Sequence, residues 1–264
     1  MSFFSANQIS AGYGRQNVIE NISFQMEAGC LTGIIGANGS GKTTLLKALC
    51  GIIPHRGTCM LGDVILERQS PRQLARLCSY IPQRSGISID ISALDVVLMG
   101  FNPRLGLLEH PTLTMKEAAV QALAQVGLSG KEQTNYLHLS EGQKQLCILA
   151  RTLISDSKLL LLDEPESALD FRFRYQMLSL LRDWVGDGAR AAIVSLHDPC
   201  LALDCCDKLI LLDEGGVLGS IEPKKDPLDH MEQMLSTIYG DVSLQQCHSR
   251  SGEPHLVMLR EEEL

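Results

Sequence analysis

Three short apolar runs stand out along the chain, at residues 31–35, 158–162 and 191–195. A continuously apolar strand is typical of a parallel sheet that is covered on both faces, because neither face meets water. The segments between these runs carry helical periodicity, so strands and helices alternate. We therefore predict an α/β fold with a mostly parallel sheet.

The N-terminal part of the chain has a different pattern. Residues 3–28 predict two short strands around a turn at 12–14, and residues 57–61 and 64–66 predict a hairpin. Strands that are joined by tight turns pair in an antiparallel manner. We therefore expect an N-terminal antiparallel β-subdomain beside the main sheet.

Helical periodicity dominates from about residue 89 to residue 155. Three helices are expected there, each opened by a capping box in which side chains satisfy the first backbone N–H groups. The boxes are Ser92-x-x-Asp95, Thr114-x-x-Glu117 and Ser140-x-x-Gln143. Because these helices interrupt the strand–helix alternation, we interpret them as an inserted helical subdomain.

The whole chain, 1–264, is interpreted as one domain with several parts. Residues 1–88 and 156–225 would form the core with its β-subdomain, and residues 89–155 the helical subdomain. Residues 226–264 would form a C-terminal extension with one helix followed by short strands. Within the core, a short helix is expected over 71–77, since Pro71 suits a first helical turn.

Composition narrows the class of protein. Of 264 residues, 45% are hydrophobic and 20% charged, as in ordinary globular proteins, and the net charge of -8 argues against a nucleic-acid partner. No apolar run reaches the about 18–20 residues of a membrane span, and the N-terminus lacks a signal-peptide pattern. Nine cysteines without C-x-x-C spacing predict reduced, mostly buried thiols in the cytosol.

A glycine-rich loop follows the first apolar run. It fits the phosphate-loop pattern G-x-x-x-x-G-K-[ST] of P-loop NTPases. Glycines let backbone N–H groups curl around phosphate oxygens, and the N-terminus of the next helix adds partial positive charge. We expect Lys42 to reach the β- and γ-phosphates of a nucleotide and Thr43 to ligate Mg²⁺. The predicted nucleotide-binding residues are Gly36, Asn38, Gly39, Ser40, Gly41, Lys42, Thr43 and Thr44.

Acidic and imidazole groups follow the other two apolar runs. The carboxyl ends of parallel strands share one rim of the sheet, so Asp163 is expected near Thr43, holding Mg²⁺ directly or through water. Glu164 is expected to face the γ-phosphate and polarise an attacking water. His197 would lie on the same rim, within hydrogen-bond reach of the γ-phosphate.

In their order along the chain, these motifs resemble the ATP-binding subunit of an ABC transporter. The further matching motifs are Tyr13 for the adenine-stacking aromatic, Gln83 in the loop before the helical insert, Leu139-Ser-Glu-Gly-Gln143 for the signature LSGGQ, Ser167-Ala-Leu-Asp170 for the D-loop, and His197 for the switch histidine. The resemblance covers nearly the whole chain. It implies ATP and Mg²⁺ as cofactors, with Thr43, Gln83 and Asp163 at Mg²⁺ and with Glu164, His197 and Gln83 in catalysis.

The resemblance also implies a composite site. In the family, two cassettes dimerise head to tail, and each ATP lies between the phosphate loop of one and the signature helix of the other. Ser140, Glu141, Gly142 and Gln143 would then face ATP bound to a second copy of the chain, with Asp170 nearby. Glu141 departs from the family, which has Gly there. A carboxylate is favourable near a helix N-terminus and unfavourable near a phosphate.

The resemblance implies further partners and a location. Two polytopic membrane permease subunits would dock near Gln83 and the helical subdomain, and an extracytoplasmic binding protein would act indirectly. The chain would lie peripherally on the cytoplasmic face of the membrane. Residues 99–106, and the tail at 238–242 and 252–255, resemble importers of iron–siderophore, haem and vitamin B12, although Phe101-Asn102 replaces the usual Arg.

Other interpretations remain open from the sequence. The chain could serve an ABC transporter for another substrate. Soluble ABC ATPases acting on nucleic acid or ribosomes usually carry a long coiled-coil insert or two cassettes, and the chain has neither. A regulatory module without hydrolysis is disfavoured by intact Lys42, Asp163, Glu164 and His197, whereas Glu141 keeps it open.

Overall fold

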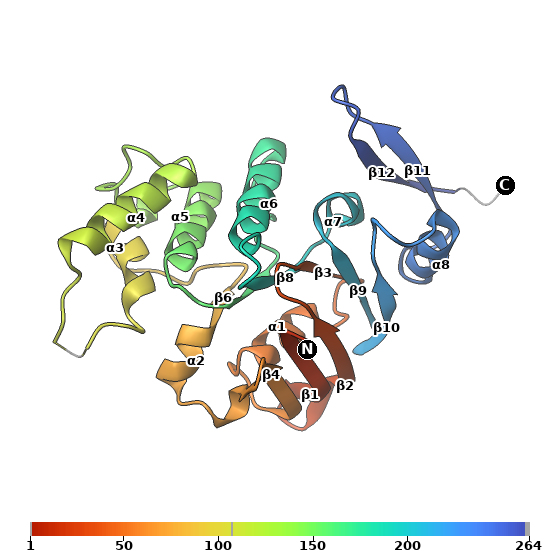
Figure 1. Cartoon of the computed structure of the whole chain (residues 1–264), viewed down its shortest axis with the longest axis horizontal. Coiled ribbons are helices and arrows are strands. Elements are labelled where there is room, and N and C mark those ends of the chain that lie inside the picture. The colour runs from red at the N-terminus through yellow and green to blue at the C-terminus, as the bar shows by residue number, and fades with distance from the viewer. Residues whose placement is uncertain (1, 107, 262–264) are drawn as a thin grey trace.

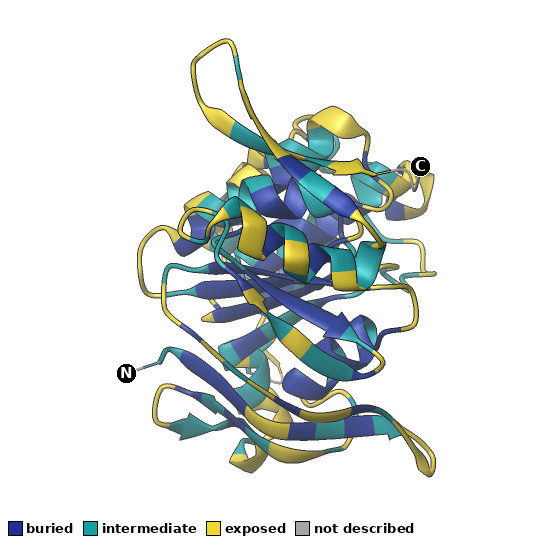
Figure 2. Ribbon diagram, turned by 90° about the vertical axis from the view of Figure 1, so that its right-hand side faces the viewer, coloured by how far each residue is buried: buried dark blue, intermediate teal, exposed yellow. Residues whose placement is uncertain are grey.

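The computed structural model describes residues 2–106 and 108–261. A six-stranded sheet of order β10-β9-β3-β8-β7-β6 forms its middle layer (Figures 1 and 2). The strands are β3 (Leu31–Ile35), β6 (Cys78–Ile81), β7 (Leu159–Asp163), β8 (Ala191–Ser195), β9 (Lys208–Asp213) and β10 (Gly216–Ile221). All neighbours pair in parallel except β9 and β10. The predicted α/β fold with a mostly parallel sheet is confirmed.

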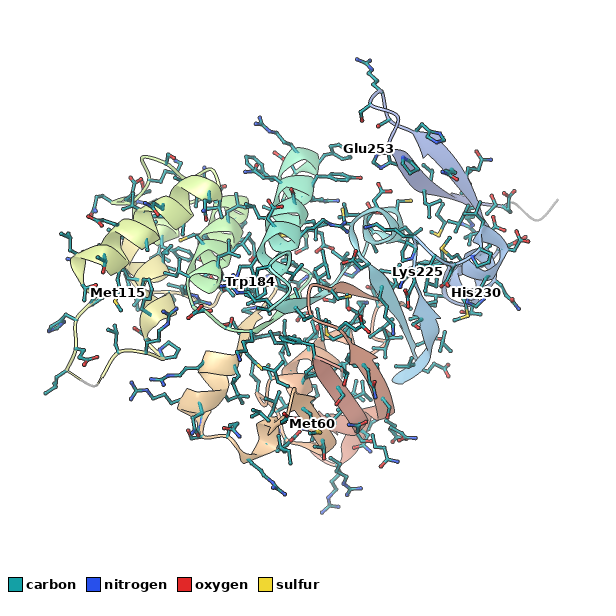
Figure 3. The ribbon with its side chains drawn as sticks, viewed as in Figure 1. Met60, Met115, Trp184, Lys225, His230 and Glu253 are labelled. Atoms are coloured by element: carbon teal, nitrogen blue, oxygen red, sulfur yellow. The ribbon has the colours of Figure 1, made fainter. Side chains whose placement is uncertain are left out.

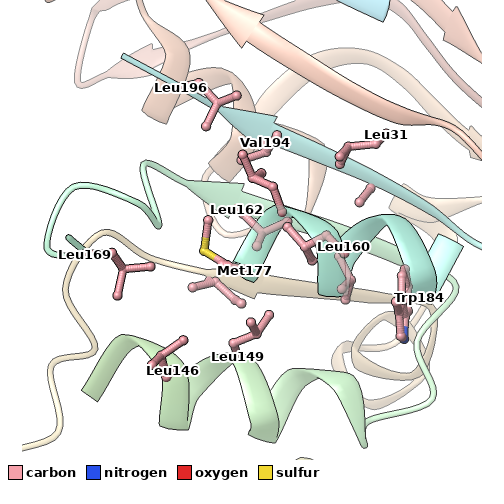
Figure 4. Packing of buried hydrophobic residues seen from close by; sticks show 14 of the residues in the cluster. Leu31, Leu146, Leu149, Leu160, Leu162, Leu169, Met177, Trp184, Val194 and Leu196 are labelled. Atoms are coloured by element: carbon pink, nitrogen blue, oxygen red, sulfur yellow. The ribbon is translucent and has the colours of Figure 1, made fainter. Parts of the chain in front are cut away.

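The apolar strands of this sheet are buried on both faces. Leu159 and Leu161 of β7 pack in one hydrophobic cluster with α1 (Lys42–Leu49) and the N-terminal sheet. Leu160 and Leu162 pack in a second cluster with the helices of the opposite face (Figure 4). Because successive side chains of a strand point to opposite faces, a strand covered twice favours apolar residues at successive positions.

A second, antiparallel sheet carries the N-terminus and forms the lower layer of Figure 2. Its order is β2-β1-β4-β5, with β1 (Phe4–Tyr13), β2 (Gln16–Met26), β4 (His55–Leu61) and β5 (Val64–Ile65). The predicted β-subdomain is therefore present, but its first two strands are not short: they contain 10 and 11 residues. Register shifts along β1 absorb the irregular residues, so pairing continues to Tyr13 opposite Gln16.

The predicted helical insert contains α3 (Ala93–Leu98), α4 (Leu113–Gln125) and α5 (Glu141–Leu153), at the left of Figure 1. Ser92 and Ser140 cap α3 and α5 as predicted. The predicted cap at Thr114 is wrong, because Thr112 accepts the hydrogen bond from the Met115 backbone N–H at 3.3 Å. Thr114 lies inside the first turn. The N-cap side chain bonds a backbone N–H, here that of Met115, and a residue of any type supplies such a group. The side-chain pattern alone therefore did not distinguish Thr112 from Thr114.

The remaining elements complete the covering layers and the C-terminal extension. They are α2 (Pro71–Leu77), α6 (Phe171–Val185), α7 (Pro199–Cys205), α8 (Leu228–Tyr239), the hairpin β11 (Val242–His248) and β12 (Pro254–Arg260), and 3-10 helices at Leu66–Arg68 (η1), Met99–Phe101 and Tyr136–His138. Trp184 of α6 is buried in the same hydrophobic cluster as Leu146 and Leu149 of α5 (Figures 3 and 4). The division of the chain at residues 89, 156 and 226 stays a prediction. No helix among the described residues is long and apolar enough to cross a membrane.

The double coverage of β7 gives a stability prediction. Leu161→Ala should lower the free energy of unfolding by about 2–5 kcal/mol, because it leaves a cavity at a position with no exposure. Leu113→Ala is the control, since Leu113 is 72% exposed and its loss should cost less than about 0.5 kcal/mol. Urea unfolding at equilibrium measures both. Similar losses in the two variants would contradict the packing described here.

Candidate functional site

The phosphate loop lies between β3 and α1, where backbone segments approach too closely for side chains. A Cβ on Gly36 would lie 2.0 Å from the Leu212 carbonyl oxygen, and one on Gly41 would lie 2.5 Å from the Ile19 side chain. Gly41 also has φ of +100°, a conformation that costs glycine little. Only glycine therefore fits at these two positions, and the residues between them at 37–39 are exposed.

Two polar side chains of the loop, those of Ser40 and Lys42, are buried. The Lys42 ammonium donates to the carbonyls of Gly36 at 2.9 Å and Ala37 at 3.1 Å. Burial lowers the pKa of Lys42, and the carboxylates of Glu164, Asp163 and Glu166 oppose that effect. The buried Ser40 hydroxyl has no hydrogen-bond partner among the described residues. A buried polar group without a partner is costly, so a ligand that offers acceptors would relieve it.

Asp163 is the meeting point of three elements. Its Oδ1 accepts from the Thr43 hydroxyl at 2.9 Å and the Ser195 hydroxyl at 3.1 Å, and its Oδ2 accepts from the Tyr80 hydroxyl at 3.0 Å. Burial, followed by the adjacent Asp163 carboxylate, raises the pKa of the Tyr80 phenol, so the phenol keeps the proton that it donates. The predicted proximity of Thr43 and Asp163 is observed.

The Glu164 carboxylate contacts the side chains of two other predicted site residues, Gln83 and His197. Its Oε2 lies 2.8 Å from the Gln83 side-chain nitrogen and 2.6 Å from the Nε2 of His197. Its backbone has φ of +47°, in the left-handed region that non-glycine residues rarely adopt, and its N–H donates to the Ser195 hydroxyl at 3.0 Å. Such a conformation costs of order 1–3 kcal/mol, and surrounding contacts must hold it.

Sequence reasoning missed Tyr80, Ser195 and Glu166. Ser195 was detectable, because it pairs with Asp163 in the parallel register of β8 and β7. Glu166 is 3% exposed and accepts a hydrogen bond from the His197 backbone N–H at 3.1 Å, while its other oxygen has no partner among the described residues. Burial raises the pKa of Glu166, and the His197 N–H acts in the opposite direction. Glu166 therefore holds the backbone of the His197 loop.

The signature residues lie on a separate surface. Ser140 and Gln143 satisfy each other's backbone N–H groups at the start of α5, and Glu141 accepts from Lys144 at 2.7 Å. Residues 140–143 line a cavity of about 350 Å³ together with Asp170. No hydrogen bond between described residues joins Ser140–Gln143 to residues 36–44 of the same chain. Within the described part of the chain, the signature residues and the phosphate loop therefore have separate hydrogen-bond partners.

Two further residues complete the description of the site. Gln145 of α5 donates its side-chain N–H to the backbone carbonyl of Gln83, so the signature helix is bonded to the residue that contacts Glu164. Tyr13 ends β1 and is 54% exposed, which leaves its ring available for stacking. The stacking role of Tyr13 stays a prediction.

The chemistry of this rim can be stated from its donors. A hydroxyl, a carboxylate and an amide oxygen are hard ligands of the kind that Mg²⁺ prefers, and Thr43, Asp163 and Gln83 offer them. Glu164 with His197 forms an acid–base pair beside them. The arrangement is suited to the transfer of a phosphoryl group to water.

Known proteins resemble this chain over most of its length. Residues 19–167 match the family described as ABC transporter. A hemin import ATP-binding protein of Bordetella pertussis is 34% identical over 90% of this chain and 93% of its own length. A manganese transport ATP-binding protein of Listeria monocytogenes is 32% identical over 89% and 95%.

Solved structures agree with these relatives. A metal-chelate type ABC transporter in an inward-facing conformation superimposes with a TM-score of 0.82 at 26% identity, over 99% of both chains. The dimeric ATP-binding cassette MJ0796, with ADP and phosphate bound, gives 0.74 at 20% identity over 83% of this chain and 98% of its own, which shows the fold alone. The resemblance inferred from the motifs is confirmed: the chain belongs to the ABC transporter family and is one of its ATP-binding cassettes.

Proposed function

We propose that this chain is the ATP-hydrolysing, energy-coupling subunit of an importer for a metal chelate, with haem as the first candidate among haem, siderophores and cobalamin. The observation that carries the proposal is the convergence of Gln83 and His197 on one oxygen of Glu164, beside the buried Asp163. The hemin import relatives and the metal-chelate transporter support the substrate class.

The residues present fit ATP and Mg²⁺. The glycine loop has no room for side chains at Gly36 and Gly41. Its Lys42 ammonium donates to neutral loop carbonyls, and its Ser40 hydroxyl has no partner among the described residues, so both can donate to phosphate oxygens. Thr43, Asp163 and Gln83 supply oxygen ligands for Mg²⁺, which neutralises phosphate charge when bound. This donor set supports the predicted roles of these residues.

The roles in hydrolysis follow from the contacts. Glu164 acts as the general base that accepts a proton from the attacking water. His197 and Gln83 hold its carboxylate in position, since both bond the same oxygen. Lys42 exchanges its loop carbonyls for phosphate oxygens and compensates their charge. Ser195 and Tyr80 keep Asp163 oriented towards Thr43.

A second copy of the chain supplies the missing half of the site. Ser140, Gly142 and the N-terminus of α5 border an open cavity and are not used by the phosphate loop of their own chain. A helix N-terminus favours an anion. We infer a two-fold homodimer in which each signature helix faces ATP on the partner, bound to two permease subunits at the cytoplasmic face of the membrane, with a substrate-binding protein outside.

A reconstitution experiment tests this function. The chain is co-expressed with a candidate haem permease, purified from membranes and placed in lipid vesicles with a haem-loaded binding protein. We expect co-purification and a haem-dependent rise in ATP hydrolysis. The manganese transport relative makes manganese the second candidate, so a manganese-loaded binding protein with its own permease forms the other arm. Co-purification with neither permease would refute the assignment to haem or manganese import.

Glu164→Gln should lower ATP hydrolysis by about 10²–10⁴-fold, because it removes the general base. ATP affinity, measured by calorimetry, should be retained, and the variant should accumulate as a dimer in ATP. Glu27→Gln makes the same chemical change at an exposed position and serves as the control. Hydrolysis by the Glu164 variant within threefold of wild type would rule out its assigned role.

Glu166→Ala should lower kcat for ATP about tenfold with little change in KM, because the His197 backbone N–H would lose its buried acceptor, at a cost of about 1–3 kcal/mol. Glu166→Gln retains an acceptor oxygen and should keep most of the activity. Steady-state kinetics on both variants, with thermal unfolding as a check on folding, distinguish positioning from general packing. Equal losses of kcat in the two variants would contradict a positioning role for Glu166.

Glu141→Gly should raise basal ATP hydrolysis, with a larger gain at low salt. Glu141 is paired with Lys144 on the helix surface, and such exposed pairs contribute only about 0–1 kcal/mol. Repulsion between the carboxylate and a partner-bound phosphate would therefore be only partly offset, and salt screens what remains. Hydrolysis rates at two ionic strengths measure the effect. An equal gain at both would show that charge is not the cause.

A further inference from the structure

A cluster of metal-ligating side chains lies on the N-terminal sheet, outside the nucleotide site. His55 and Cys59 belong to β4 and Glu67 belongs to η1. One ligand atom from each side chain lies within 4.8 Å of the other two. Cys59 directly precedes Met60, which lies in the lower part of the view in Figure 3, away from Glu253 near the top.

The local fold brings the three residues together. His55 and Cys59 are separated by an even number of positions along β4, so both project from the same face. The chain returns through β5, and η1 places Glu67 against that face. The Glu67 Oε1 accepts from the Cys59 backbone N–H at 2.6 Å and lies 3.0 Å from the Nε2 of His55. The strand itself therefore orients the carboxylate.

Burial and access differ among the three ligands. Cys59 is 0% exposed, the His55 side chain is 8% exposed and that of Glu67 is 29% exposed. Burial, with the neighbouring Glu67, raises the pKa of the Cys59 thiol. A cavity of about 480 Å³ is lined by His55 and Glu67, so an ion and a water molecule can reach the cluster from one side.

We propose that His55, Cys59 and Glu67 bind one zinc ion, with a water from the adjacent cavity as the fourth ligand. Imidazole nitrogen, thiolate sulfur and carboxylate oxygen are the three ligand types that Zn²⁺ uses in tetrahedral sites. Mg²⁺ and Ca²⁺ select oxygen ligands, which separates this site from the one at Asp163. The thiol proton is released to solvent when the ion binds.

The ion would join β4 to η1 and stabilise the N-terminal sheet. An ion that binds only the folded chain adds stability in proportion to its occupancy. The hydrogen bond between His55 and Glu67 does not involve the Cys59 thiol. The proposed zinc site uses that thiol as its third protein ligand.

The test uses the full chain after treatment with a chelator, in a Cys247→Ser background that removes the exposed thiol. Co²⁺ is the spectroscopic probe, because a cobalt–thiolate bond gives a charge-transfer band, and Zn²⁺ is then added as competitor. We expect one Co²⁺ per chain, a thiolate band that Zn²⁺ abolishes, and a rise in melting temperature with Zn²⁺.

Cys59→Ser should remove the band, and His55→Gln and Glu67→Gln should each weaken binding at least about tenfold. Cys147→Ser is the matched control, since Cys147 is equally buried but lies in α5 away from the cluster, and it should bind as the parent does. If Cys59→Ser does not fold, the His55 and Glu67 variants decide the result. Absence of a thiolate band, or a band that survives all three substitutions, would overturn the proposal.

Discussion

The carboxylate of Asp163 is the point on which the nucleotide site depends. A buried charge is tolerated only when it is paired or hydrogen-bonded, and Asp163 receives hydroxyl donors from α1, β6 and β8. These bonds fix the phosphate loop relative to the carboxyl ends of three adjacent parallel strands. The same rim then places Glu164 and His197 within one hydrogen bond of each other. The parallel sheet is thus the scaffold that converts separate motifs into one site.

The site is linked to the helical insert by a short path. Gln145 of α5 bonds the backbone of Gln83, and Gln83 bonds Glu164. A shift of α5 against the core would therefore change the position of the Glu164 carboxylate. In the proposed dimer, the start of α5 also faces the partner's ATP, so one helix both senses the second nucleotide and contacts the residue beside the first. This physical connection is what an energy-coupling subunit needs.

Much of this arrangement could be predicted from the sequence, for identifiable reasons. The strands β3 and β8 have the predicted bounds because mostly apolar runs are favoured where both faces are covered. The helix α2 also has its predicted bounds, since Ser70 and Pro71 define its start. Thr43 and Asp163 could be placed together because the parallel sheet fixes which strand ends meet.

The rest could not be predicted, because it depends on contacts between side chains far apart in sequence. Tyr80 is an ordinary strand residue until the fold brings its hydroxyl to Asp163. Glu166 is an acidic residue in a loop, and a sequence gives no sign that it is buried against the His197 backbone. The cap at Thr112 and the length of the N-terminal hairpin depend on backbone geometry in the same way.

The central claim is the proposal that Asp163 binds a divalent cation together with ATP. Binding of Mn²⁺, a paramagnetic substitute for Mg²⁺, tests it most directly. It is measured by electron paramagnetic resonance in the presence of a non-hydrolysable ATP analogue, for wild type and Asp163→Asn. The account predicts that the substitution weakens Mn²⁺ binding at least about tenfold, while affinity for the analogue without metal is retained. Equal Mn²⁺ affinity in the two proteins would contradict it.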